Sequence, residues 1–401
     1  MTSRQVNFTG YRRGATLISV HRVLAATIAL GVVAAASAAT PPDLVSDPLT
    51  RQAWIARQAV YRINTTVRFS AVVLDGTSHP LGGGSGHDIA ILGTGFAVVE
   101  GGTLVTAAHV VQPSGRSVAI DLERERRRLV GDVSNEVTLK KWADEHKVGV
   151  SGLRVVRRTA TRVTEPGETT PQPRALRFRF LRGTTRPAID VSNDVAVVAV
   201  DAPGSPALTL ANIPQDGQRS ALVGFGAPSD GRSPTTKIGL TGAEGRDPGG
   251  RRLIPIGAAV RQGDSGGPAV DVDGHVLGMA SLTDGDNLGN LTPVQQIREL
   301  MERAGLANNP GAPSDHFPTA MRHIWAFELD RARTELRQAL AKDPENVSAA
   351  FEQRRVHELE GQRYRIAGEN HLDGALGALA LAALLTSAAL GAAAVRRVSD
   401  R

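Results

Sequence analysis

The stretch Gly-Asp-Ser-Gly-Gly-Pro at residues 263–268 is the most informative part of this sequence. A serine hydroxyl is a poor nucleophile at neutral pH, so it needs a base to take its proton and donors to stabilise an oxyanion. Glycines two positions before and one position after Ser265 allow the backbone to turn sharply. We therefore predict that Ser265 is a nucleophile and that the amides of Gly263 and Ser265 form an oxyanion hole. The alternative is a glycine-rich turn that only joins two strands.

A single histidine follows a short apolar run in Leu-Val-Thr-Ala-Ala-His-Val at residues 104–110. An imidazole at the end of a strand can face a cleft, so His109 is the predicted general base for Ser265. His87 and His275 are competitors, but neither follows an apolar strand with small residues before the histidine.

An aspartate directly precedes another apolar run in Asn-Asp-Val-Ala-Val-Val at residues 193–198. A carboxylate in this place can reach the rear nitrogen of an imidazole, fix its tautomer and stabilise the imidazolium. Asp190 lies four residues earlier and is the alternative. We favour Asp194 because it leads directly into the strand.

Short apolar and β-branched runs, broken by Gly, Pro and Asp, extend from residue 63 to residue 279. This pattern predicts an all-β sandwich or barrel. Residues 121–190 differ, because their excess of basic over acidic side chains equals the net charge of the whole chain, +6. Within them Arg177-Phe178-Arg179-Phe180 predicts a strand with one basic and one apolar face. The basic face is either a solvated edge or a surface for membrane lipid or an acidic partner.

The order of four motifs resembles that of the trypsin-like (chymotrypsin-fold) serine peptidases. The motifs are Gly-Thr-Gly-Phe at 93–96, Thr-Ala-Ala-His, Asn-Asp-Val-Ala and Gly-Asp-Ser-Gly-Gly-Pro, and the resemblance covers about residues 60–305. It implies a mainly β fold of two six-stranded antiparallel barrels with the active site between them. It also implies that His109 is general base and acid, Asp194 orients it and Ser265 is the nucleophile. The absence of cysteine makes bacterial members the better match.

The same resemblance suggests the residues that select the substrate. Ala259 matches the residue at the base of the specificity pocket, where no acid is present to bind Arg or Lys. Ser281, Leu282 and Thr283 match the strand that pairs with the substrate backbone, and Thr283 replaces a glycine that keeps the pocket open. We predict a small or medium apolar side chain before the scissile bond. Residues 121–190 correspond to a large basic insertion.

Composition excludes several classes of protein. A chain with no cysteine has no disulfide, no thiolate metal site and no catalytic cysteine. With 41% hydrophobic and 21% charged residues, disorder throughout the chain is not expected. We predict no metal, no organic cofactor and no nucleic-acid partner; the expected partner is a protein or peptide substrate.

Both ends of the chain carry apolar runs. Residues 1–40 begin with arginines, continue into an uncharged run and contain Ala36-Ser37-Ala38, which indicates a signal peptide or an uncleaved N-terminal anchor. Residues 374–395 are uncharged and, at about 1.5 Å each, could cross a hydrocarbon core of ~30 Å as a transmembrane helix. Arg396 and Arg397 predict a cytoplasmic tail at 396–401. We expect a bacterial membrane protein with its peptidase domain, residues 41–305, on the extracytoplasmic side.

The segment after residue 305 changes to a helical pattern. A linker at 306–316 precedes a helical segment at 317–371, in which Ala332, Leu336, Ala339 and Pro344 keep the spacing of a tetratricopeptide repeat. His323 occupies a position where that repeat has an aromatic residue. The segment is either a repeat-like module that could bind a protein partner or an ordinary helical hairpin that serves as a spacer.

Together these observations predict a serine endopeptidase that cleaves exported or cell-envelope proteins. Two alternatives remain at this point. One is a membrane-anchored interaction module with a peptidase-like fold and latent activity, and the other is a serine esterase.

Overall fold

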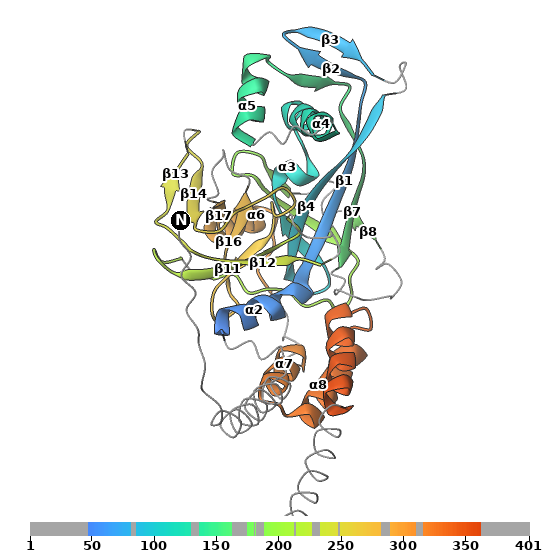
Figure 1. Ribbon diagram of the computed structural model, residues 1–401, viewed down its shortest axis with the longest axis vertical. Coiled ribbons are helices and arrows are strands. Elements are labelled where there is room, and N and C mark those ends of the chain that lie inside the picture. Colours follow the sequence, from blue (N-terminus) through green and yellow to red (C-terminus); the bar gives the residue numbers. More distant parts are fainter. Residues whose placement is uncertain are drawn as a thin grey trace, which may run out of the picture. The chain divides into compact units, whose positions relative to one another are not determined.

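Antiparallel strands make up most of the computed structural model of this chain (Figure 1). The structure describes residues 47–81, 86–129, 136–162, 175–179, 181, 188–211, 214–226, 233–247, 249–281, 289–309 and 316–361. One unit comprises Val45–His357 and contains every strand that the structure describes. A second unit, Met1–Leu44 with Glu358–Arg401, lies almost wholly outside the described residues.

The first sheet closes into a six-stranded barrel. Its strands pair in the order β5-β4-β1-β7-β8-β10, all antiparallel, and β5 pairs again with β10 to complete the ring. A seventh strand, β9, extends the sheet beside β10. The strands are β1 (Val60–Phe69), β4 (His87–Val99), β5 (Thr103–Thr106), β7 (Arg154–Arg162), β8 (Leu176–Arg179), β9 (Ala188–Asp190) and β10 (Val195–Val200).

The second sheet has seven antiparallel strands in the order β12-β11-β15-β16-β17-β14-β13. An isolated bridge between Thr241 and Ile256 joins the end of β12 to β14, so this sheet also curves back on itself. Its strands are β11 (Arg219–Gly224), β12 (Thr235–Leu240), β13 (Gly245–Arg246), β14 (Arg252–Ile256), β15 (Pro268–Val270), β16 (Val276–Ser281) and β17 (Gly289–Pro293). The predicted mainly β fold with a closed antiparallel barrel is therefore confirmed.

Along β1 of the first sheet, buried side chains alternate with more exposed ones, because successive side chains of a β-strand point to opposite faces. The alternate residues Ile63, Thr65, Val67 and Phe69 are buried, whereas Asn64, Thr66 and Arg68 between them are half-exposed. A large apolar cluster joins this interior to α2 (Pro48–Ala56) and to α6 (Val294–Arg303), and a separate cluster fills the second barrel.

Part of the basic insertion is helical, which corrects the prediction of short strands throughout residues 63–279. Helices α4 (Gly115–Leu129) and α5 (Glu136–Glu145) follow the short helix α3 (Ala108–Val111), and they lie beside a small sheet (Figure 1). The small sheet contains β2 (Ala71–Leu74), β3 (Thr77–Pro80) and β6 (Gly149–Ser151). Buried Ile120 and Leu139 pack against Leu74, and Glu123 pairs with Arg126 and Arg127 one helical turn away. Such pairs three and four residues apart favour a helix, and charge composition alone did not reveal them.

The predicted strand with one basic and one apolar face exists as β8. Arg177 and Arg179 are exposed, whereas Phe178 packs against the core of the first barrel. Phe180 lies outside the described residues.

Three more helices follow α6 in the part of the chain that the structure describes. The helix α7 (His316–Trp325) packs beside α8 (Leu329–Lys342) and also contacts α2, and residues 347–361 are again helical (Figure 1). The small positions Ala320, Ala332 and Ala339 are buried between these helices. His323 hydrogen-bonds Glu328 at 2.6 Å instead of packing as an aromatic residue would. Resemblance to a tetratricopeptide repeat stays a prediction.

Buried polar groups attach this helical segment to the first barrel. Arg162 at the end of β7 donates both Nη atoms to Asp343 at the end of α8, at 2.8 and 2.5 Å, and both side chains are buried. The indole Nε1 of Trp54 donates to Glu352 Oε1 at 2.8 Å, and Glu352 is fully buried. These bonds hold the helical segment against β7 and α2.

Replacing Trp54 by phenylalanine is expected to lower the free energy of unfolding by about 1.5–3 kcal/mol, because the buried carboxylate of Glu352 loses its indole donor. Urea denaturation of the full-length protein, followed by circular dichroism, measures the change. Trp142→Phe is the control, since the structure gives the Trp142 indole no hydrogen bond to any described residue. Equal losses in the two variants would contradict the role of the Trp54–Glu352 bond.

No helix among the described residues is long and apolar enough to cross a membrane. The predicted signal or anchor segment at 1–40 and the predicted transmembrane run at 374–395 both lie outside the described residues.

Candidate active site

His109 and Asp194 come together because β5 and β10 are neighbouring antiparallel strands. Thr106 on β5 lies opposite Ala196 on β10, so the histidine just after β5 and the aspartate just before β10 meet at one end of the pair. His109 Nδ1 lies 3.0 Å from both carboxylate oxygens of Asp194, and the backbone N–H of His109 donates to Asp194 Oδ1 at 3.0 Å. A carboxylate only accepts, so Nδ1 carries the proton and Nε2 keeps a free lone pair.

Two further side chains hold Asp194. Ser281 at the end of β16 donates its hydroxyl to Asp194 Oδ2 at 2.9 Å. Arg251 donates to that same hydroxyl at 3.1 Å and lies 3.6 Å from Asp194 Oδ2, while Asp247 fixes Arg251 from the other side. Asp194 itself has a positive φ of 55°, a conformation that aspartate tolerates better than most residues. No local sequence pattern pointed to Arg251, which places a positive charge beside the carboxylate.

Asp190, the alternative to Asp194, has a different set of partners. It accepts hydrogen bonds from Ser192 and from both the backbone and side chain of Asn193, and it pairs with Arg303 at 2.5 Å. Burial opposes ionisation, but these donors outweigh it and lower the pKa of Asp190 well below its usual range. Its contacts shape the turn that leads into Asp194.

Ser265 is almost fully buried, with 1% of its surface exposed, and its Oγ has no hydrogen-bond partner among the described residues. The amides of Gly263 and Ser265 likewise donate to no acceptor that the described part of the chain provides. An unused hydroxyl and two unused donors therefore belong to the same short loop. Buried polar groups normally find partners, so this loop is suited to receive a ligand that completes them.

Thr94 on β4 links the serine loop to the strand that leads to His109. Its N–H donates to the carbonyl of Ser265 at 2.8 Å, and its hydroxyl donates to the carbonyl of Gly263 at 2.6 Å. Its own carbonyl accepts the hydroxyl of Thr106 at 2.6 Å. A Cβ on Gly266, whose φ is +91°, would overlap the Thr94 carbonyl oxygen, so this position requires glycine.

Asp264 anchors the serine loop to the second barrel. Its carboxylate is fully buried and accepts hydrogen bonds from the backbone N–H groups of Gly226 at 2.9 Å and Arg261 at 2.8 Å. It also forms an ion pair with the ammonium of Lys237 on β12. A Cβ at Gly226 would collide with this carboxylate. Because Asp264 lies between Gly263 and Ser265, its anchorage fixes the direction of both free amides. Sequence reasoning missed Lys237.

The basic insertion reaches the same loop. Asp121 on α4 pairs with Arg124 and accepts a hydrogen bond of 3.4 Å from Gln262, which directly precedes Gly263. The insertion thus borders the candidate site instead of lying apart from it.

The other predicted site residues are placed as follows. Ala259 is half-buried in the segment that follows β14. Leu282 and Thr283 lie outside the described residues. His87 stacks its ring edge against Phe69, and His275 belongs to the turn between β15 and β16.

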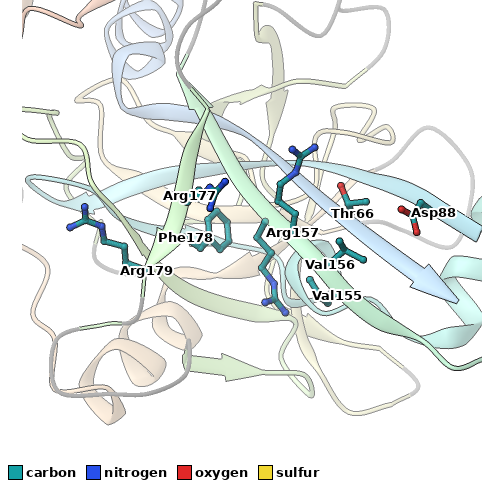
Figure 2. Close-up of a pocket in the computed structure, with 9 residues that line it drawn as sticks. Thr66, Asp88, Val155, Val156, Arg157, Arg177, Phe178 and Arg179 are labelled. Atoms are coloured by element: carbon teal, nitrogen blue, oxygen red, sulfur yellow. The ribbon is translucent and has the colours of Figure 1, made fainter.

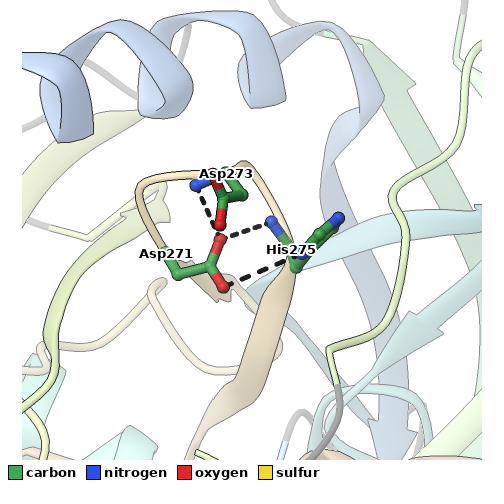
Figure 3. Close-up of side chains that lie close together, drawn as sticks. All are labelled: Asp271, Asp273 and His275. Carbon is green, nitrogen blue, oxygen red and sulfur yellow. Dashed lines mark hydrogen bonds and ion pairs between the residues drawn. The ribbon is translucent and has the colours of Figure 1, made fainter.

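That turn contains a cluster with metal-ligating side chains, formed by Asp271, Asp273 and His275 (Figure 3). Asp271 Oδ1 already accepts the backbone amides of Asp273 at 2.9 Å and His275 at 2.8 Å, and the ring of His275 lies 3.9 Å from Asp271 Oδ2. These bonds explain the cluster as part of a tight hairpin.

Comparisons with known proteins agree with this geometry. The family model described as "Trypsin-like peptidase domain" matches residues 93–279, which include His109, Asp194 and Ser265. A putative serine protease HhoB from Synechocystis is 32% identical over 123 residues, 28% of this chain and 29% of the relative. The mitochondrial serine protease HTRA2 of Bos taurus is 28% identical over 234 residues, 58% of this chain and 40% of the relative.

Two solved structures are also similar. The serine endoprotease from Yersinia pestis aligns with 66% of this chain and 67% of its own, at 16% identity and a TM-score of 0.38. The active form of the Rv3671c protease from M. tuberculosis aligns with 68% and 91%, at 21% identity and a TM-score of 0.39.

The chain spans less than half the length of the curated relatives that it matches. Within that span, the match extends from the Thr94 motif on β4 to Met279 on β16 and so takes in the strands that carry the candidate site. Residues 93–279 of this chain are therefore similar to the trypsin-like peptidase domain family.

Proposed function

We propose that this protein is a serine endopeptidase in which Ser265 is the nucleophile. The observation that carries the proposal is the pairing of His109 Nδ1 with Asp194 at 3.0 Å, which leaves Nε2 free to act as a base. The match of residues 93–279 to the trypsin-like peptidase domain and the unpartnered hydroxyl of Ser265 support it.

The reaction follows from these groups. Ser265 Oγ attacks the peptide carbonyl carbon while His109 Nε2 takes the hydroxyl proton. The carbonyl oxygen becomes an oxyanion, which accepts hydrogen bonds from the backbone N–H groups of Gly263 and Ser265. The imidazolium then protonates the leaving amine, so the C–N bond breaks and an acyl-enzyme remains. Water repeats the sequence on the ester and releases the acid. Asp194 stabilises the imidazolium throughout without taking its proton.

The proposed substrate is an exported or cell-envelope protein with a small or medium apolar residue before the scissile bond. The support is Ala259, which offers no charge to an Arg or Lys side chain, and Thr283 at a position where the family has glycine. Peptide substrates that differ only at this residue, Ala, Val, Arg or Asp, measure the preference. A higher kcat/KM for Arg than for Ala or Val would contradict it.

The pH dependence of the proposed reaction follows from His109. Burial alone lowers the pKa of its imidazole, but the charge of Asp194 and their hydrogen bond outweigh burial and raise the pKa above 6.5. A general base works in its neutral form, so kcat/KM is expected to fall as the pH drops through a midpoint above 6.5.

Two substitutions should move this midpoint in opposite directions. Asp194→Asn removes the negative charge and should lower it, whereas Arg251→Met removes a positive charge that lowers the pKa of His109 and should raise it. Profiles of kcat/KM against pH with one peptide substrate measure both. A midpoint that neither change moves would show that another group limits the rate at low pH.

Labelling with a fluorophosphonate tests the proposed function directly. The full-length protein should be labelled, and Ser265→Ala and His109→Ala should not, because the first lacks the nucleophile and the second lacks its base. Labelling of all three proteins alike, or of none, would contradict the proposal. A peptide chloromethyl ketone that inactivates the enzyme, when a lipid-like phosphonate does not, would separate a peptidase from an esterase.

We also propose that the peptidase domain acts on the extracytoplasmic side of a bacterial membrane. The support is the sequence of residues 1–40 and 374–395. The chain has no cysteine, so a single Ser114→Cys at the exposed residue just before α4 gives a unique label site. A membrane-impermeant maleimide should label it in intact cells, and labelling only after lysis would contradict this location.

A further inference from the structure

The first barrel carries a pocket of about 620 Å³ that the proposed reaction does not use (Figure 2). Strands β1, β4, β7 and β8 contribute its lining. Four of the lining residues are arginines: Arg157 and Arg158 from β7, and Arg177 and Arg179 from β8.

The pocket opens where two neighbouring strands diverge. β7 and β8 pair at only two positions, Thr159 with Arg177 and Ala160 with Leu176. On its other side β7 pairs with β1 over nearly its whole length. Residues 154–158 of β7 therefore have no strand partner on the β8 side among the described residues. In the described part of the chain, the backbone N–H and C=O groups that these residues direct away from β1 form an open edge, which is a template for one more extended segment.

The arginine side chains gather on the outer face of this edge. Thr159 lies opposite Arg177, and side chains alternate along a strand, so Arg157 and Arg179 stand on the same face as Arg177. All three arginines are exposed. Phe178, between two of them, turns inward to the barrel core.

Among the described residues, two of the four arginine side chains have neither a hydrogen bond nor an ion pair. Arg158 donates to the carbonyl of Val111 at 2.6 Å, and Arg179 pairs with Asp201 at 2.6 Å. The carboxylate in the pocket, Asp88, already pairs with Arg68 through two bonds of 2.5 and 2.6 Å. Arg157 and Arg177 have no carboxylate partner in the described part of the chain, so an anion bound between them would relieve their mutual repulsion.

We propose that this pocket binds an extended acidic peptide segment, which pairs with the open edge of β7 and places carboxylates on Arg157 and Arg177. A guanidinium binds a carboxylate through two parallel hydrogen bonds. The strand edge favours a peptide over a lipid headgroup, because a headgroup has no backbone to pair with it. Val156, 49% exposed beside the arginines, gives an apolar contact for a side chain between two carboxylates. This site is independent of the proposed peptidase reaction.

Fluorescence anisotropy with a labelled ten-residue peptide of alternating Glu and Val tests the proposal. The protein is the full-length chain with Ser265→Ala, which prevents cleavage of the probe. Saturable binding that weakens as salt rises is expected, since exposed charges are screened beyond about 8 Å at physiological ionic strength. Arg157→Glu with Arg177→Glu should weaken binding about tenfold or more, and Arg157→Gln with Arg177→Gln should weaken it less.

A matched pair of exposed arginines on α8, Arg331→Glu with Arg337→Glu, makes the same charge change elsewhere and should leave binding unaltered. A peptide of alternating Lys and Val should not bind. Equal affinity of the parent and the Arg157/Arg177 variants, or equal loss in the α8 control, would overturn the proposal. Arginine-dependent binding of phosphatidylglycerol vesicles without binding of the peptide would also overturn it, in favour of a lipid surface.

Discussion

Replacing Ser265 by alanine is expected to lower kcat on a peptide substrate by about 10⁶-fold, the loss typical when the nucleophile of such a triad is removed. The same substitution should not lower the free energy of unfolding. Ser265 Oγ is buried without a partner, so its removal breaks no hydrogen bond and takes away a polar group that is costly to bury. Activity and stability are therefore expected to respond in different ways to one change.

Active-site titration and steady-state kinetics measure the first effect, and urea denaturation measures the second. Ser117→Ala, a half-exposed hydroxyl on α4, is the matched control and should leave turnover unchanged. If Ser265→Ala kept more than about a thousandth of the wild-type rate, another nucleophile would have to be sought.

Replacing Lys237 by methionine is expected to lower the free energy of unfolding by about 3 kcal/mol, because it leaves the buried carboxylate of Asp264 without its cation. The cost lies at the lower end for a broken buried pair, since 17% of the Lys237 side chain is exposed and water can reach it. The rate of fluorophosphonate labelling should fall as well. Asp264 lies between the two free amides, so a displaced carboxylate would turn them away from the oxyanion.

Two further variants separate this effect from the loss of any lysine. Lys141→Met removes an exposed lysine that lies 3.8 Å from Glu145, and it should cost no more than about 0.5 kcal/mol. Adding Asp264→Asn to Lys237→Met should restore part of the stability, because it removes the buried charge. Stability unchanged in Lys237→Met, or equal losses at Lys141 and Lys237, would show that the ion pair does not anchor the loop.

Those residues of the candidate active site that lie in local sequence motifs could be predicted from the sequence. His109 follows an apolar run, Asp194 precedes one and Ser265 lies in a glycine-rich motif, and each of these patterns is visible within seven residues. Lys237 and Arg251 could not be found in this way, because each meets its partner only through the pairing of distant strands. Nothing in Thr-Thr-Lys-Ile-Gly-Leu distinguishes a buried cation from an ordinary exposed lysine on a strand.

The fold was predictable to a similar extent. Short apolar and β-branched runs, broken by Gly, Pro and Asp, indicated an all-β sandwich or barrel, and the antiparallel barrels were expected from the family resemblance. Helices α4 and α5 were not predicted, because the net charge of residues 121–190 does not show the helical spacing of Glu123 with Arg126 and Arg127 on α4. Register and strand order depend on contacts between remote residues, and no short window of sequence contains them.

The crowding around Gly266 has a consequence for descendants of this protein that have lost their activity. A side chain at this position would collide with the Thr94 carbonyl whether or not Ser265 reacts, so selection for folding alone should preserve this glycine. The ring of His109 bonds only to Asp194 among the described residues, and its loss would disturb packing far less. Descendants without activity should therefore keep Gly266 and accumulate substitutions first at position 109. In such a set of sequences, Gly266 would indicate common descent, and His109 would indicate that the proposed peptidase activity has been retained.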